Sequence, residues 1–192
     1  MRTSRLRPAL LCVALLPSAH ADWTLDNAAS KLHFASIKAG NIAEVHHFTE
    51  LQGTISEAGA VSLTVNTASV ETLIPIRNER MRDMLFQSGL FPDAVFTAQL
   101  DPQTLKTVAV DAPQRVDVRG ELKIRETSVP VSATLLATRL SARQLLVSTI
   151  APVMVDAGRL GLGEGVEMLR EVAGLPAIST AVPITFTLSF SG

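Results

Sequence analysis

The chain is poor in cysteine and in aromatic residues, and both shortages narrow what it can do. Cys12 is the single cysteine among 192 residues, so the chain can form neither an internal disulfide nor a multi-thiolate metal site. Tyrosine is absent, there is one tryptophan, and aromatic residues make up 4% of the sequence. Hydrophobic residues nevertheless reach 47%, so the apolar content is largely aliphatic and suits β-strands.

The chain also lacks an excess of charge of either sign. It carries 17 Lys and Arg against 18 Asp and Glu, without a basic run. Nucleic-acid binding depends on clustered positive side chains that neutralise phosphates, so no nucleic acid is expected as a partner. Beyond residue 21, no apolar run approaches the ~20 residues of a membrane-spanning helix, and no membrane span is expected there.

The first 21 residues have the three-part layout of a secretory signal peptide. Arginines near the N-terminus give a positive start, an apolar stretch follows over residues 9–16, and Ala19-His20-Ala21 forms an A-x-A cleavage site. The apolar stretch is less than half as long as a membrane span. We therefore expect residues 1–21 to be removed on export to the periplasm, leaving one domain over residues 22–192.

Alternation of polar and apolar residues dominates the rest of the chain and predicts strands with one solvent-facing and one buried side. In residues 114–125, charged residues such as Arg119, Glu121 and Lys123 alternate with Gly120, Leu122 and Ile124. The same period recurs at residues 61–66, 96–100, 129–135 and 182–190. Weaker strands are expected at residues 31–37, 45–55, 105–110 and 145–150, with Asp101-Pro102 as a turn.

Two segments follow a helical period instead. Residues 76–87 begin after Pro75, which is favourable at a helix start, and place several apolar residues near one face. Residues 166–173 have apolar residues at helical spacing and end at Gly174. The glycines between residues 158 and 165 indicate a mobile loop before this second helix.

Roughly nine strands with one apolar side each cannot be covered by two short helices, so their apolar sides must face one another. The sequence therefore predicts an all-β fold, an antiparallel barrel or sandwich with one or two short helices. A barrel of about eight strands encloses an interior that side chains fill or that holds one ligand. Small inward residues, Ala98, Gly120 and Ala133, favour a cavity, whereas Phe96 and Phe186 could fill it.

Residues able to carry catalysis or hold a metal are few. His46 and His47 are adjacent and would point to opposite sides of a strand, so with His33 they are expected to be surface or loop histidines. Neither an H-E-x-x-H nor a G-x-S-x-G motif occurs, and Gly161–Gly165 lacks the lysine of a P-loop. The charged segment 77–83 is typical of a solvated helix face. No catalytic residue, metal or cofactor is expected.

A set of short motifs resembles the YceI-like family. The motifs are Trp23-Thr24-Leu25-Asp26 with Leu32-His33-Phe34, Phe48-x-x-Leu51-x-Gly53, residues 65–72 ending in S-V-x-T, Phe91-Pro92-Asp93-Ala94-Val95-Phe96, and Gly120-Glu121-Leu122-Lys123-Ile124. They span nearly all of residues 22–192 in the family's order. The family's R-D-x-H-L pattern is replaced in residues 77–85, and the region 158–174 looks longer than is usual there.

The resemblance implies an exported, lipocalin-like antiparallel barrel that holds a long polyisoprenoid, a quinone-like or prenyl lipid, without catalysing a reaction. Arg77 and Arg80 would lie at the mouth and orient the head group. The apolar inward positions would contact the lipid: Leu32, Phe34, Leu63, Val65, Phe96, Leu122, Ile124, Val131, Leu135, Ile184, Phe186 and Leu188.

Two other classes stay open on the sequence. An outer-membrane barrel shares export and alternation, but it needs aromatic girdles, and this chain has one tryptophan and no tyrosine. An enzyme acting on an isoprenoid lipid would use the charged segment 77–83 at the barrel mouth. The sequence sets neither the length of the ligand nor the oligomeric state, and a dimer is compatible with it.

Overall fold

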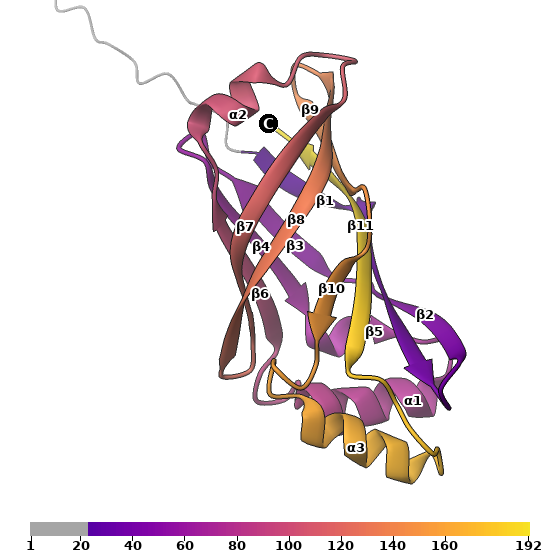
Figure 1. The fold of residues 1–192 in the computed structure, drawn as a ribbon. Coiled ribbons are helices and arrows are strands. Elements are labelled where there is room, and N and C mark those ends of the chain that lie inside the picture. The colour runs from indigo at the N-terminus through magenta and orange to yellow at the C-terminus, as the bar shows by residue number, and fades with distance from the viewer. Residues whose placement is uncertain (1–22) are drawn as a thin grey trace, which may run out of the picture.

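The computed structural model describes residues 23–192, and the expected signal peptide, residues 1–21, lies outside them. Figure 1 shows strands wrapped around one axis, with α2 at one end and α1 and α3 side by side at the other. In chain order the elements are β1 (Trp23–Lys38), β2 (Ile42–Phe48), β3 (Leu51–Ile55), β4 (Ala60–Asn66), η1 (Thr67–Ser69), β5 (Val70–Glu71), α1 (Pro75–Arg80), η2 (Met81–Phe86), β6 (Asp93–Gln99), α2 (Pro102–Thr107), β7 (Gln114–Ile124), β8 (Thr127–Ser141), β9 (Gln144–Thr149), β10 (Val153–Asp156), α3 (Gly163–Val172) and β11 (Ala181–Ser191).

The sheet closes on itself because its first and last strands, β1 and β11, pair with each other. The closed ring has eight antiparallel strands, in the order β1-β3-β4-β6-β7-β8-β9-β11. Closure leaves these strands without an unpaired edge, which removes the usual site of edge-to-edge aggregation. The prediction of an all-β antiparallel barrel with short helices is confirmed.

The two strands that close the barrel change partners along their length. β1 pairs with β3 at Trp23 and Thr24, and beyond a break in register after Asp26 it pairs with β2 over residues 32–38. β11 pairs with β10 over residues 181–184 and with β9 over residues 187–191. The short strands β2 and β10 therefore continue the wall of the barrel toward the α1–α3 end.

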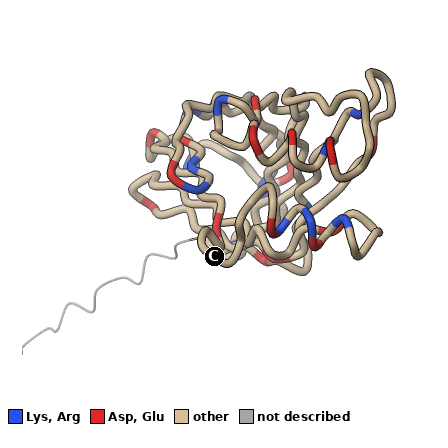
Figure 2. Tube along the Cα trace, turned by 90° about the horizontal axis from the view of Figure 1, so that it is seen from below, with Lys and Arg blue, Asp and Glu red and all other residues tan. Residues whose placement is uncertain are grey.

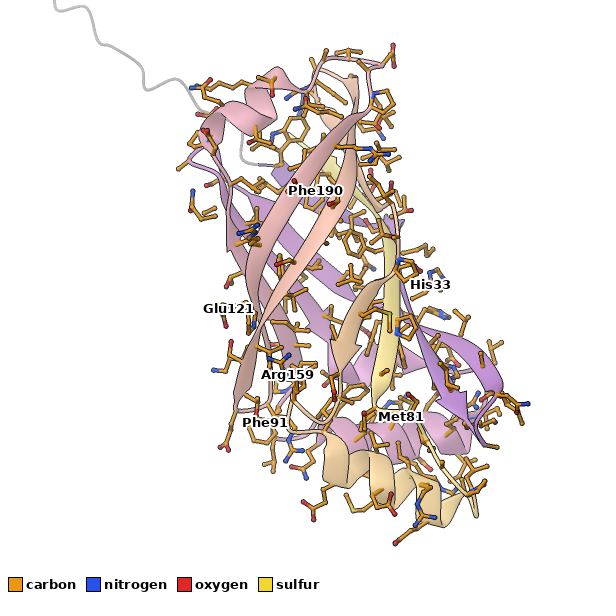
Figure 3. All side chains as sticks on the ribbon, in the orientation of Figure 1. His33, Met81, Phe91, Glu121, Arg159 and Phe190 are labelled. Carbon is orange, nitrogen blue, oxygen red and sulfur yellow. The ribbon has the colours of Figure 1, made fainter. Side chains whose placement is uncertain are left out.

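Side chains alternate across the wall as the sequence predicts. In β7, Arg119, Glu121 and Lys123 are exposed, whereas Leu122 and Ile124 are half-buried. In β11, Thr187 is exposed and Leu188 is buried. Glu121 lies outside the barrel and Phe190 inside it (Figure 3). The register is therefore the predicted one, because a shift by one residue would bring charged side chains into the interior.

The helix predicted over residues 76–87 is confirmed as two continuous parts, α1 and the π-helical turn η2. The helix predicted over residues 166–173 also forms, but α3 begins at Gly163. Gly165 lets α3 approach η2 closely, since a Cβ there would lie 2.6 Å from the carbonyl oxygen of Met84. The glycines before α3 therefore include one with a packing role.

Two strand predictions are wrong. Residues 105–110 do not form a strand, because the Asp101 carboxylate accepts a hydrogen bond from the Gln103 amide and Pro102 starts the helix α2. Asp101-Pro102 is thus a helix start and not a turn between strands. Residues 45–55 form parts of two strands, β2 and β3, which separate at Thr49 and Glu50.

The helix α2 is held against the barrel by Arg139 of β8. Arg139 Nε donates to the carbonyl oxygen of Val108 at 3.0 Å, and its Nη2 donates to that of Leu105 at 2.8 Å. The same guanidinium lies 5.1 Å from the centre of the Trp23 ring. One side chain thereby satisfies two carbonyls that the short helix and its end leave unpaired.

Candidate binding cavity

The barrel encloses a cavity of about 510 Å³. Its lining runs from Leu105 of α2 and Val108 just after it to Leu169 and Val172 of α3, so the cavity extends along the barrel axis. Inward side chains such as Leu122 keep part of their surface accessible, although they face away from the outside of the barrel. The interior is therefore hollow over part of its length, a point on which the sequence left two answers open.

The apolar residues that were predicted to contact a lipid all line this cavity, and so do Arg77 and Arg80 of α1. They come from β1, β4, β6, β7, β8 and β11, so strands far apart in the sequence contribute to one surface. The apolar set is Leu32, Phe34, Leu63, Val65, Phe96, Leu122, Ile124, Val131, Leu135, Ile184, Phe186 and Leu188. Their contact with a ligand stays a prediction.

Sequence reasoning missed the residues that line the two ends of the cavity. Leu105 lies on α2, Met81 and Leu85 lie on η2, and Val166 and Leu169 lie on α3. Their helical spacing was visible in the sequence for η2 and α3, but nothing there indicated that these faces cover a barrel. The helices therefore complete the apolar lining as well as the fold.

The room in the cavity does not come from Gly120, contrary to expectation. A Cβ at Gly120 would lie 2.2 Å from the carbonyl oxygen of Thr97 and 2.6 Å from the ring of Phe96. The ring thus occupies the space above the glycine, and neither Gly120 nor Ala98 lines the cavity, whereas Ala133 does. The missing side chain of Gly120 therefore lets β6 approach β7 closely and lets the Phe96 ring pack over the glycine.

Polar side chains gather at the end of the cavity where β1 and β2 continue the wall. Along the inner side of β1, Leu32 and Phe34 are followed by Ser36 and Lys38. On β2, His46 lies opposite Phe34 and Glu44 lies opposite Ser36. The lining thus changes from apolar to polar toward the β1–β2 turn. Figure 2, seen from this end, shows positive and negative residues interspersed around the molecule.

Glu44 is the centre of a small ion network at the polar end. Its Oε2 lies 2.8 Å from Lys38 Nζ and 2.7 Å from Arg77 Nη1. Arg77 Nη2 donates to the carbonyl oxygen of Thr72 at 2.7 Å, which ties α1 to the segment before it. The hydrogen bond from Lys38, helped by the charge of Arg77, lowers the pKa of Glu44 against the opposing effect of burial.

His46 is buried in the cavity wall, with 3% of its surface exposed, so its expected place at the surface or in a loop is wrong. Its Nε2 lies 3.0 Å from Ser36 Oγ, and its ring centre lies 5.3 Å from that of Phe34. Burial, together with the charge of Arg77, lowers the pKa of His46, so the imidazole is neutral near pH 7. His33 and His47 pair on the other side of these strands, 5.9 Å apart.

Within residues 23–192, no group of three or more His, Cys, Asp or Glu lies close enough together to hold a metal ion. None of the helices in this part of the chain has the length and apolar character to cross a membrane.

Comparison with protein families matches residues 23–190 to the YceI-like domain. A solved polyisoprenoid-binding domain from Saccharophagus degradans, implicated in plant cell wall breakdown, is 36% identical, with a TM-score of 0.85 over 88% of this chain and 98% of that one. Burkholderia cenocepacia BcnA is 17% identical, with a TM-score of 0.64 over 86% of this chain and 98% of that one. Comparison with curated proteins finds no match.

A Campylobacter jejuni YceI protein that crystallizes with large solvent channels is 14% identical, with a TM-score of 0.53 over 77% of this chain and 84% of that one. At such identities BcnA and the C. jejuni protein show that the fold is shared. The S. degradans domain resembles this chain in sequence as well.

Proposed function

The chain belongs to the YceI-like family, and from this premise we propose that it is an exported, non-catalytic carrier that holds a long polyisoprenoid lipid inside its barrel. The observation that carries the proposal is the cavity of about 510 Å³, which runs along the barrel axis between apolar strand faces. The similarity to a domain described as polyisoprenoid-binding supports this class of ligand.

The mechanism is partition of an apolar chain from water into a preformed apolar cavity. Each 100 Å² of apolar surface that leaves water contributes about 2.5 kcal/mol. Because Leu122, Ile124 and Phe186 already line open space, a ligand needs to displace few side chains. A chain-like lipid suits a cavity that extends from α2 to α3 better than a compact ligand would.

The polar end of the cavity gives the bound lipid an orientation. Arg77 and Arg80 lie there with Lys38 and Glu44, whereas the lining toward α2 is formed by residues such as Leu105 and Val108. A lipid with a polar head would place that head beside α1 and its tail toward α2. This arrangement is typical of binding sites in which a few polar groups set the direction of an apolar ligand.

Lipid binding can be tested on protein purified from its native host. Native mass spectrometry should show a folded species heavier than the polypeptide, and solvent extraction should release an isoprenoid. Protein that carries no lipid, and that takes up none when offered isoprenoids, would refute the carrier. Chemical conversion of the bound lipid during incubation would favour the lipid-modifying enzyme instead.

Export is tested separately. The sequence of residues 1–21 predicts a mature N-terminus at Asp22 and recovery of the protein in the periplasmic fraction. An intact Met1 in folded, lipid-loaded protein would contradict export. Retention of the mature chain in the outer-membrane fraction would favour the membrane-barrel alternative over a carrier.

A further inference from the structure

Two buried nitrogen atoms in the cavity wall have no hydrogen-bond partner within residues 23–192. They are Nδ1 of His46 and Nε of Arg77, and both residues line the polar end of the cavity. Buried polar atoms in folded proteins nearly always have a partner. Two unpaired nitrogens on residues lining the same end of one cavity therefore point to a polar group of the ligand.

Glu44 connects Arg77 to the strand that carries His46, and the charge of Arg77 acts on the His46 ring. Glu44 and His46 are two residues apart on the same side of β2, roughly 7 Å along the strand. The Glu44 carboxylate binds Arg77 Nη1, so the guanidinium is held beside the strand that carries His46. Ser36 holds the other nitrogen of the imidazole, Nε2, at 3.0 Å. Both side chains are thus fixed by partners on the protein before any ligand enters.

The free atoms favour a single small polar group. Arg77 uses one N–H of Nη1 for Glu44 and one N–H of Nη2 for the Thr72 carbonyl, and its Nε is the guanidinium nitrogen without a partner. Both outer nitrogens of the guanidinium are therefore already held by the protein, one of them by a carboxylate, and the missing partner is the one for Nε. His46 Nδ1 donates or accepts, depending on whether Ser36 Oγ donates to Nε2 or accepts from it. A hydroxyl fits this pair, because its oxygen accepts from Arg77 and can either donate to His46 or accept from it.

Charge leads to the same ligand class. Lys38 and Arg77 both bind the Glu44 carboxylate, so these three groups together carry one positive charge and neither cation is without a carboxylate partner. A phosphate beside Arg77 would compete with the Glu44 carboxylate for Arg77 and Lys38 and would be repelled by it, which is unfavourable in a largely buried wall. An uncharged oxygen has no such cost. Arg80 also lines the cavity and is the group through which a phosphate could still be held.

We propose that His46 and Arg77 form the head-group site of this cavity, and that the head group is an uncharged hydroxyl, as in an isoprenoid alcohol, and not a phosphate. The inference rests on the proposed carrier function, since it assigns the polar end of the same cavity. It makes His46 and Arg77 specificity-determining residues, with Ser36 and Glu44 as positioning residues.

The test uses three probes that share one C20 isoprenoid tail: geranylgeraniol, geranylgeranyl monophosphate, and the hydrocarbon in which hydrogen replaces the hydroxyl. Each is titrated into the mature protein after its own lipid has been removed. The alcohol should bind at least tenfold more tightly than the hydrocarbon or the phosphate. His46→Leu and Arg77→Met should each remove this preference, so that the variant binds the alcohol no more tightly than it binds the hydrocarbon.

His47→Leu is the matched control, because His47 is adjacent in sequence but pairs with His33 on the other side of the strands. It should leave the preference for the alcohol unchanged. Binding of the hydrocarbon by each variant shows that the cavity has formed, so a misfolded variant is not mistaken for a positive result. Having two variants keeps the test decisive if one of them fails to fold.

Tighter binding of the phosphate than of the alcohol would overturn the assignment of the head group. A preference for the alcohol that survives in both His46→Leu and Arg77→Met would overturn the assignment of the site. In either case, binding of the hydrocarbon would leave the carrier function standing. If the wild type binds none of the three probes, the carrier function and the head-group site are both refuted.

Discussion

A charge introduced at Leu122 should prevent the cavity from taking up lipid while leaving the barrel folded. Leu122 lies in β7, pairs with Phe96 and Val129 on the neighbouring strands, and lines the cavity. In Leu122→Glu, the carboxylate of the unloaded protein would face the hollow interior, where water can reach it. The barrel should therefore still form, while an apolar tail in the cavity would press against an unpaired charge.

The size of the effect follows from the alternative open to the carboxyl group, which is to take up a proton. Protonating a group with an ordinary pKa of about 4.3 at pH 7.4 costs roughly 4 kcal/mol, and this sets an upper limit. That free energy corresponds to about a thousandfold loss of affinity. At pH 5 the same cost falls to about 1 kcal/mol, or roughly fivefold.

The assay is the amount of geranylgeraniol bound per folded protein at both pH values, relative to the wild type at the same pH, with folding checked by circular dichroism. Leu122→Phe adds volume without charge and should cost no more than about 1–3 kcal/mol from overpacking. Lys123→Glu places a carboxylate on the exposed side of β7 and should load normally. A folded Leu122→Glu protein with wild-type loading at pH 7.4 would show that the tail does not pass this residue. The same deficit at both pH values would refute the electrostatic cause of the loss.

Three further predictions concern stability. Gly165→Ala should lower the free energy of unfolding by about 1–3 kcal/mol, because its Cβ would lie 2.6 Å from the Met84 carbonyl oxygen. Gly163→Ala is the control and should leave this free energy nearly unchanged, because the nearest atom to its Cβ is 3.6 Å away. Equal melting temperatures of the two variants would contradict the prediction. Leu73→Asn should raise the free energy of unfolding by about 1 kcal/mol in denaturant titrations. Leu73 has φ 63°, a left-handed conformation that Asn adopts more easily than Leu, and it is 85% exposed, so little packing is lost. An unchanged midpoint would count against strain at this position. Because the pKa of His46 is lowered in the folded protein, His46 binds a proton more readily in the unfolded chain, and the wild type should lose stability as the pH falls below about 6.5. A His46→Leu protein should lack this contribution to the pH dependence. Identical pH dependence of unfolding in the two proteins would refute the prediction.

The strand period predicted an antiparallel barrel or sandwich and most of the residues that line its interior, and the resemblance to the YceI-like family selected the barrel. In β7 and β11 the period correctly separated inward from outward residues, because successive side chains of a strand point to opposite sides. It failed at residues 105–110, where Leu105, Val108 and Val110 fit a short strand as well as a helix. The helix there is determined by a local feature, the Asp101 cap followed by Pro102, and the same two residues are also typical of a turn.

The polar end of the cavity was harder to predict, because it depends on pairing between strands and on long-range packing. His46 falls on the inner side of β2, but the sequence pattern predicts residues 45–55 as one strand and therefore does not show that β2 pairs with β1. Arg77 was predicted at the mouth, whereas its bonds to Glu44 and Thr72 join residues that no local pattern connects. The contact of α3 with η2 at Gly165 is of the same kind.

The attachment of α2 by Arg139 has a consequence for how the barrel responds to its solvent. Arg139 binds two neutral carbonyl oxygens and a ring, so these bonds change little when salt is added. At the other end, Arg77 and Glu44 are joined by a partly exposed ion pair. The Debye length shrinks from about 10 Å at 0.1 M to about 3 Å at 1 M ionic strength, which weakens such pairs. Rising ionic strength should therefore weaken the attachment of α1 more than that of α2, so that salt acts on one end of the molecule.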